Sequence, residues 1–146
     1  MEIQYWADIA CSYCYMGITQ LQRALKELKI ADQTPLKFMS FQLDPTLPTT
    51  AVKRLYQLYF NDNESITDYE ALTVAMNEIR LPVADVKKVL ESNQYEDEVR
   101  KNERRAFMIG MPSAPLFVIN NKYSITGAQP YEVFLEALKK VKNTTK

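Results

Sequence analysis

The spacing of apolar residues changes along the first 48 residues from that of a strand to that of a helix and back. Residues 2–7 predict a short strand, because they contain a mainly apolar run from Ile3 to Ala7 with two aromatic side chains. From about Ser12 onward, leucines recur at helical spacing, with polar residues between them. Residues 36–43 alternate in part and are rich in phenylalanine, so they predict a second strand. The order of elements in this half is therefore β-α-β.

Residues 49–110 show helical spacing only, which predicts an insert of several helices. One of these helices carries an aromatic stripe that includes Tyr56, Tyr59 and Phe60. The last helix of the insert is highly charged, and we expect its polar residues to form a solvated face.

The C-terminal residues return to strand spacing and then end in a helix. The apolar run 116–119 is followed by two asparagines and then by residues 122–126, which predicts a hairpin with 122–126 as the second strand. An amphipathic helix follows Pro130. A β-α-β unit followed by β-β-α is the plan of an α/β thioredoxin-like fold with a central mixed sheet. The expected boundaries within a single domain, 1–146, are 1–48 for the N-terminal half, 49–110 for the all-helical insert and 111–146 for the C-terminal half.

Composition and charge narrow the classes of function. The chain has 18 basic and 18 acidic residues, so no electrostatic argument favours a nucleic acid as partner. No apolar run approaches the roughly 18 residues of a membrane span, and no secretory signal precedes the first strand, so we expect a cytoplasmic protein without a membrane partner. Histidine is absent, which excludes a Ser-His-Asp or Cys-His nucleophile and a histidine zinc ligand.

The two cysteines of the chain form one motif, Cys11-Ser12-Tyr13-Cys14, where the first predicted strand runs into the first helix. Unpaired N–H groups and the positive dipole end at a helix N-terminus favour a thiolate, which is the reactive form of cysteine. The motif therefore predicts a dithiol/disulfide redox site. The alternative is two ordinary core cysteines that stand three residues apart.

The chain resembles the DsbA-like thiol–disulfide oxidoreductases, in the FrnE-type branch. The resemblance covers both halves of the predicted fold, in the expected order. Four motifs carry it: Trp6-Ala7-Asp8-Ile9-Ala10-Cys11-Ser12-Tyr13-Cys14-Tyr15-Met16-Gly17, Ser40-Phe41-Gln42-Leu43-Asp44-Pro45, Gly110-Met111-Pro112-Ser113-Ala114-Pro115-Leu116-Phe117-Val118-Ile119 and Tyr123-Ser124-Ile125-Thr126-Gly127-Ala128-Gln129-Pro130.

This resemblance implies a role for each residue around the motif. Cys11 would be the nucleophile that forms a mixed disulfide with a thiol or disulfide substrate, and Cys14 would resolve it. Pro115 matches the cis-proline of the family, whose loop packs beside the Cys-X-X-Cys turn. The backbone of Ala114 would then pair with an extended substrate segment, with Ser12 and Tyr13 also lining the substrate site. No cofactor or metal is expected beyond the redox-active disulfide, although glutathione is a candidate co-substrate.

Three departures from the family pattern shape the expected function. Ser12-Tyr13 is not the common Pro-aromatic pair and contains no histidine, which favours a reductase or isomerase over a strong oxidant. Gln4 aligns with a position where relatives often carry a carboxylate near the second cysteine.

The third departure is a helical insert that looks shorter than in relatives. A shortened insert would leave Tyr56, Tyr59 and Phe60 as an uncovered surface for a homodimer or a client protein. The alternative is a stripe buried in a smaller core.

Other functions remain compatible with the sequence. Ser12 would suit a glutathione-dependent isomerase or transferase on the same fold, in which a serine activates glutathione. A degenerate insert would suit a non-catalytic partner-binding protein. Two copies of the Cys-X-X-Cys motif could also supply four thiolates to a zinc ion across a symmetric dimer.

Overall fold

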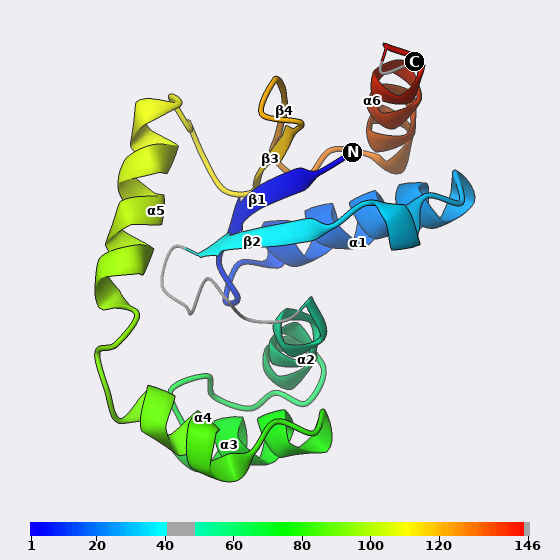
Figure 1. Ribbon diagram of the computed structural model, residues 1–146. Helices are drawn as coiled ribbons and strands as arrows, with labels where there is room; N and C mark the ends of the chain where they lie inside the picture. Colours follow the sequence, from blue (N-terminus) through cyan, green and yellow to red (C-terminus); the bar gives the residue numbers. More distant parts are fainter. Residues whose placement is uncertain (41–48, 145–146) are drawn as a thin grey trace.

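A four-stranded mixed sheet forms the centre of the computed structural model, which describes residues 1–40 and 49–144 (Figure 1). Helices α1, α5 and α6 surround the sheet, and α2, α3 and α4 form a group below it (Figure 1). In chain order the elements are β1 Ile3–Ala7, α1 Ser12–Glu27, a 3-10 turn at Ala31–Gln33, β2 Leu36–Ser40, α2 Thr49–Phe60, α3 Tyr69–Glu78, α4 Val83–Leu90, α5 Glu96–Met108, β3 Leu116–Ile119, β4 Tyr123–Thr126 and α6 Tyr131–Thr144.

Strand β1 occupies the interior of the sheet, whose strand order is β2-β1-β3-β4. It pairs parallel with β2 and antiparallel with β3, which in turn pairs antiparallel with β4. All five residues of β1 are buried, as expected for a strand covered on both faces. The sequence prediction of a thioredoxin-like α/β fold is confirmed. The predicted strand at 36–43 is seen as far as Ser40, and its last residues, with most of the second motif, lie outside the described residues.

The two faces of β1 point into two separate apolar clusters. Ile3, Tyr5 and Ala7 face the main core, which α1, α2 and α6 complete. Trp6 faces the opposite side, where it packs with α5, and its indole N–H donates a hydrogen bond of 3.1 Å to the carbonyl of Asn102. The strand therefore holds the start of α1 on one face of the sheet and α5 on the other.

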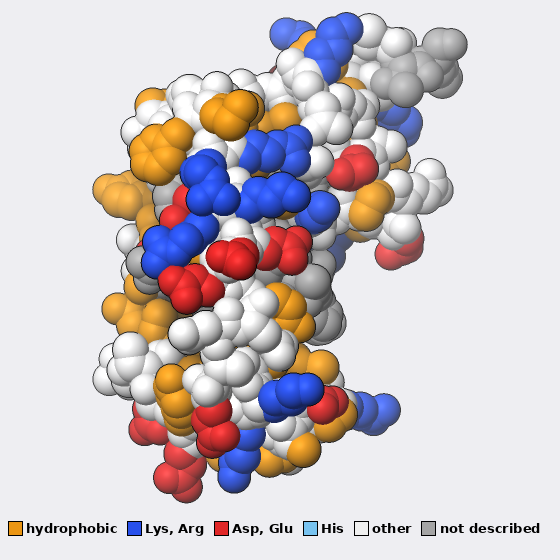
Figure 2. Space-filling model, turned by 60° about the vertical axis from the view of Figure 1, so that its left-hand side comes forward, with side chains coloured by type: hydrophobic (Ala, Val, Ile, Leu, Met, Phe, Trp, Pro, Cys, Tyr) orange, Lys and Arg blue, Asp and Glu red, His pale blue; other side chains and the backbone are white. Residues whose placement is uncertain are grey.

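The solvent side of α5 is highly charged, as the sequence predicts. Figure 2 brings this side of the molecule forward and shows basic side chains gathered above a group of acidic ones. Along α5, acidic residues fill the first turn and a basic residue lies in the last turn. The acidic residues near the N-terminus and the basic residue near the C-terminus both complement the helix dipole.

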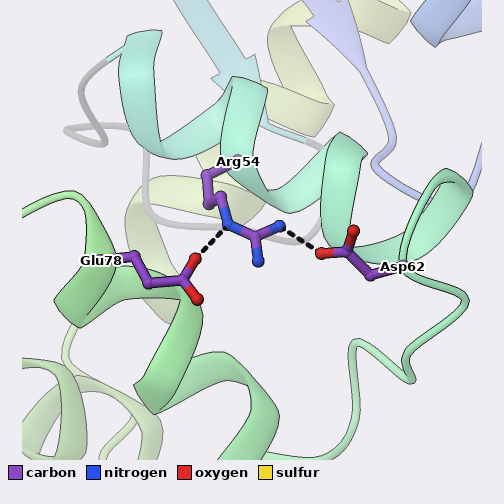
Figure 3. Close-up of polar contacts among 3 residues, drawn as sticks. All are labelled: Arg54, Asp62 and Glu78. Atoms are coloured by element: carbon purple, nitrogen blue, oxygen red, sulfur yellow. Dashed lines mark hydrogen bonds and ion pairs between the residues drawn. The ribbon is translucent and has the colours of Figure 1, made fainter.

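The insert is held together by an arginine that bridges two acidic side chains (Figure 3). Arg54 of α2 donates from Nη1 to Asp62, in the loop after α2, and from Nε to Glu78 of α3, both at 2.7 Å. The guanidinium is largely buried, whereas both carboxylates are exposed. This bridge links α2 both to α3 and to the loop that follows α2.

Replacing Arg54 with methionine is expected to lower the free energy of unfolding by about 1 kcal/mol, because two charge-assisted hydrogen bonds are lost while water still solvates both acids. Urea unfolding followed by circular dichroism measures this loss. The matched control is Arg100→Met, which removes the exposed Arg100–Glu96 pair of α5 and should change stability by less than about 0.5 kcal/mol. Equal losses in the two variants would contradict the structural role of Arg54.

The aromatic stripe of α2 is mostly buried, so the expectation of an uncovered apolar surface on the insert is wrong for most of it. Tyr56 is fully buried, Phe60 is half-buried, and Tyr59 is exposed. Tyr15 of α1 stacks on Tyr56 and on Phe60, at ring-centroid distances of 5.1 and 5.4 Å. The alternative reading, a stripe buried in the core, is the one that the structure supports. The hypothesis of a homodimer through this stripe therefore loses its main argument.

Candidate functional site

The cysteine motif begins where β1 ends, at a turn that Asp8 organises. The Asp8 carboxylate accepts the N–H of Ala10 at 2.9 Å, and its carbonyl accepts the N–H of Cys11 at 3.2 Å. Cys11 is the N-cap of α1, with extended backbone angles. Its sulfur accepts the N–H of Cys14 at 3.3 Å. The thiol thus takes the place of the oxygen that usually caps a helix, at the positive end of the helix dipole.

The two thiols lie in different environments. Both cysteines are free, but Cys11 is half-buried whereas Cys14 is 0% exposed and belongs to the main core. Burial raises the pKa of Cys14 to about 12, and the hydrogen bond with Cys11 also raises it, while a backbone hydrogen bond from Asp8 lowers it. At neutral pH Cys14 is therefore a protonated thiol. Only the Cys11 sulfur can meet a molecule from solvent without a change in the fold.

The loop before β3 packs against the cysteine helix. The Ala114–Pro115 peptide bond is cis, and Pro115 is buried. Gly17 lies one turn after Cys14, and a Cβ at this position would stand 3.1 Å from both the Pro115 ring and the Phe117 ring. This close approach suits glycine, since a Cβ would require the Pro115 or Phe117 ring to shift by a few tenths of an ångström.

Within the part of the chain that the structure describes, only some main-chain groups of this loop form hydrogen bonds. The N–H of Gly127 donates to the Pro115 carbonyl at 2.7 Å. Half-buried Ala114 precedes the strand, and within residues 1–40 and 49–144 its N–H and carbonyl have no hydrogen-bond partner. These two groups are therefore available to an incoming extended segment.

Side chains next to the thiols give the site an apolar rim. Ser12 and Tyr13, the two residues between the cysteines, are exposed, and Tyr13 is 63% exposed. Met16 follows one turn along and is also exposed. Exposed aromatic and methionine side chains beside a reactive thiol suit contact with polypeptide.

Sequence reasoning missed one residue close to the thiols. Tyr56, predicted as part of a stripe on the insert, donates its hydroxyl to the Asp8 carbonyl at 3.3 Å. The charge of a Cys14 thiolate contributes to the raised pKa of Tyr56, after burial, which places the phenol near the sulfurs. The only signal in the sequence was the tyrosine within an apolar stripe.

The expectation that a carboxylate in place of Gln4 would lie near Cys14 is wrong. Gln4 lies one residue before Tyr5 on β1, so alternation places it on the face of Trp6 and α5, opposite the core that contains Cys14. Its amide N–H₂ donates to Glu2 at 3.2 Å, and its buried oxygen has no partner among the described residues. A carboxylate at this position would not face Cys14.

Two further expectations bear on metals and membranes. Within the described ranges, no group of three or more His, Cys, Asp or Glu side chains could hold a metal ion. Cys14 is fully buried, so a zinc ion shared between two copies through both cysteines of each would require the helix start to open. None of the helices in the described part of the chain has the length and hydropathy that a membrane span requires.

Burial of Cys14 predicts that the reduced protein loses stability as the pH rises above about 8.5, the pKa of an unfolded cysteine. The folded pKa of Cys14 is raised to about 12, so the unfolded chain releases this proton first. The contribution is complete below the unfolded pKa and is lost as the pH rises toward the folded pKa. At about pH 10 we expect a loss of about 2 kcal/mol in the free energy of unfolding.

The measurement is urea unfolding under reducing conditions between about pH 7.5 and pH 10, for the wild type and Cys14→Ala. Tyr5 and Tyr56, whose pKa values burial also raises, are present in both proteins, so the part of their contributions that burial causes cancels in the comparison. The variant should lose stability less steeply with pH. Parallel slopes would contradict the buried, protonated state of Cys14.

Comparison with known proteins places the chain in a family. Residues 46–139 match the sequence model of the DSBA-like thioredoxin domain, a segment longer than half of the chain that begins after both cysteines. The uncharacterized protein YwbO of Bacillus subtilis strain 168 is 30% identical over 86 residues, which are 58% of this chain and 42% of YwbO. The aligned part thus spans less than half of that relative.

Solved structures share the whole fold. A probable DsbA oxidoreductase from Streptomyces coelicolor superposes with a TM-score of 0.86 at 24% identity, covering 98% of this chain and 90% of that chain. A putative protein disulfide isomerase from Nitrosomonas europaea gives a TM-score of 0.80 at 12% identity, covering 99% and 98% of the two chains. Because nearly all of the Nitrosomonas chain is covered, a shortened insert does not distinguish this chain from that protein. At such identities the likeness concerns the fold, and the family follows from the sequence match: the chain belongs to the DSBA-like thioredoxin domain family.

Proposed function

We propose that the chain is a thiol–disulfide oxidoreductase that works through Cys11 and Cys14. One observation carries the proposal: a pair of free thiols at the N-terminus of α1, of which one is reachable and the other is buried directly behind it. This asymmetry suits Cys11 as the attacking sulfur and Cys14 as the resolving sulfur. Two features favour an extended polypeptide as substrate: the main chain of Ala114, which has no hydrogen-bond partner among the described residues, and the exposed Tyr13 beside the thiols.

The exchange proceeds in two balanced steps. The Cys11 thiolate attacks one sulfur of a substrate disulfide, which forms a mixed disulfide and releases the other substrate sulfur as a thiolate. Cys14 then loses its proton to water and attacks the Cys11 sulfur, which frees the second substrate thiolate and leaves a Cys11–Cys14 disulfide. The protein has given two electrons to the substrate, and an external thiol such as glutathione returns them.

The direction and the place of action are part of the same proposal. The Ser12-Tyr13 pair contains no histidine to stabilise the Cys11 thiolate, which favours a reductase or isomerase over a strong oxidant. The proposal assigns this activity to the FrnE-type branch, on the motifs that resemble it. A reducing cytoplasm with glutathione as co-substrate would suit such an activity. Ser12 is exposed, but it lies between two cysteines that can already form a redox-active pair. This arrangement favours thiol exchange over a glutathione transferase in which the serine activates glutathione.

The decisive experiment equilibrates the protein with glutathione buffers of graded redox potential and counts free thiols by alkylation and mass. We expect one cooperative two-electron transition between the dithiol and a Cys11–Cys14 disulfide. A midpoint near about −270 mV would indicate a reductase, and one near about −120 mV an oxidant. Two independent glutathione adducts, with no internal disulfide at any potential, would overturn the proposal.

A further inference from the structure

The main chain of Asp8 connects three groups at the centre of the site. Its carbonyl accepts the N–H of Cys11 at 3.2 Å and the hydroxyl of Tyr56 at 3.3 Å. A backbone hydrogen bond from Asp8 also reaches Cys14. One backbone residue therefore links both cysteines to a side chain from the helical insert, 48 residues away in the sequence.

Tyr56 is held firmly in this position. The side chain is 1% exposed, and its ring stacks on Tyr15, the residue after Cys14, at 5.1 Å and 17°. Phe60 also stacks on Tyr56, at a ring-centroid distance of 6.4 Å. Burial raises the pKa of Tyr56, so its hydroxyl keeps its proton and remains a donor. A buried hydroxyl needs an acceptor, and the Asp8 carbonyl is the one that the fold provides.

We propose that Tyr56 is a positioning residue for thiol exchange, whose hydroxyl fixes the Asp8 carbonyl and through it the turn that carries Cys11. The inference rests on the proposed function of the Cys11–Cys14 pair. In the dithiol form described here, the turn brings the N–H of Cys14 to the Cys11 sulfur at 3.3 Å. Loss of the Tyr56 hydrogen bond would free the Asp8 carbonyl and weaken this turn, which stabilises the dithiol form. The helical insert thereby contributes to the redox balance of the site through Tyr56.

The test compares Tyr56→Phe with Tyr15→Phe. Each substitution removes one hydroxyl from the same aromatic stack and keeps the ring, but within the described residues the Tyr15 hydroxyl has no hydrogen-bond partner. The reaction measured is the equilibrium of the protein dithiol and glutathione disulfide with the protein disulfide and two glutathione thiols. Because a bond of 3.3 Å is long for a hydroxyl donor, we expect Tyr56→Phe to shift this equilibrium toward the protein disulfide by about twofold to fivefold.

Two controls separate this role from a merely structural one. Urea unfolding, followed by the fluorescence of the single buried Trp6, measures any general loss of stability. Tyr15→Phe should leave the glutathione equilibrium at the wild-type value. An equilibrium for Tyr56→Phe that equals that of Tyr15→Phe would overturn the inference, whatever its stability. Failure of the wild type itself to form an internal disulfide would instead overturn the proposed function.

Discussion

Cys11→Ala is expected to reduce insulin no faster than dithiothreitol does alone, when dithiothreitol is the electron source. The part of the rate that the protein adds should fall at least about 100-fold relative to the wild type. The remaining thiol cannot replace the lost one, because Cys14 is fully buried and its pKa is raised to about 12. It is therefore both unreachable and protonated at neutral pH. A turbidity assay of insulin reduction measures the rate.

Cys14→Ala is the matched control, because it removes the other thiol of the same turn and keeps the exposed one. This variant should still attack a substrate disulfide but should fail to resolve the product. We expect a mixed disulfide to accumulate, visible as a covalent complex on a non-reducing gel and absent from Cys11→Ala. In the folded variants, iodoacetamide should modify Cys11 quickly and Cys14 slowly. Covalent complexes of equal amount in both variants would contradict the division of roles.

The architecture and the thiols could be predicted from the sequence because each depends on local patterns. The change from strand to helix spacing and back marks β1, α1 and β2, and a Cys-X-X-Cys motif at a strand-to-helix turn has few structural alternatives. The partner loop at Pro115 could be found only through resemblance, since nothing local connects residues 11 and 115. Its contact with Gly17 depends on how β3 pairs with β1.

The wrong expectations have a common cause, which is that a pattern fixes a face of an element but not what covers that face. The period of α2 places Tyr56 and Tyr59 on an apolar side, yet only the packing of α2 against Tyr15 decides that Tyr56 is buried and Tyr59 is not. Likewise, alternation along β1 separates Gln4 from Tyr5, but the side on which α1 docks decides which of them faces Cys14. Such choices depend on tertiary packing between segments distant in the sequence.

Phe117 connects the two halves of the site through its packing. Its ring is fully buried in β3, stacks on Tyr5 at 6.1 Å and meets Phe134 edge-on at 5.1 Å. The same ring lies against Gly17 of the cysteine helix. Truncation would leave a cavity between the sheet, α1 and α6 that these rigid neighbours cannot fill. Phe117→Ala is therefore expected to lower the free energy of unfolding by about 3–5 kcal/mol.

A loss of this size approaches the whole stability of a marginal domain, which is of the order of 5–15 kcal/mol, so urea unfolding is best measured at low temperature through Trp6 fluorescence. Phe107→Ala provides the matched control, because Phe107 is 75% exposed on α5 and its truncation should cost less than about 0.5 kcal/mol. Phe117→Leu should recover most of the loss, since leucine refills part of the volume. If Phe117→Ala were no more damaging than Phe107→Ala, the packing of β3 against the cysteine helix would not be what holds the thiol turn beside the Pro115 loop.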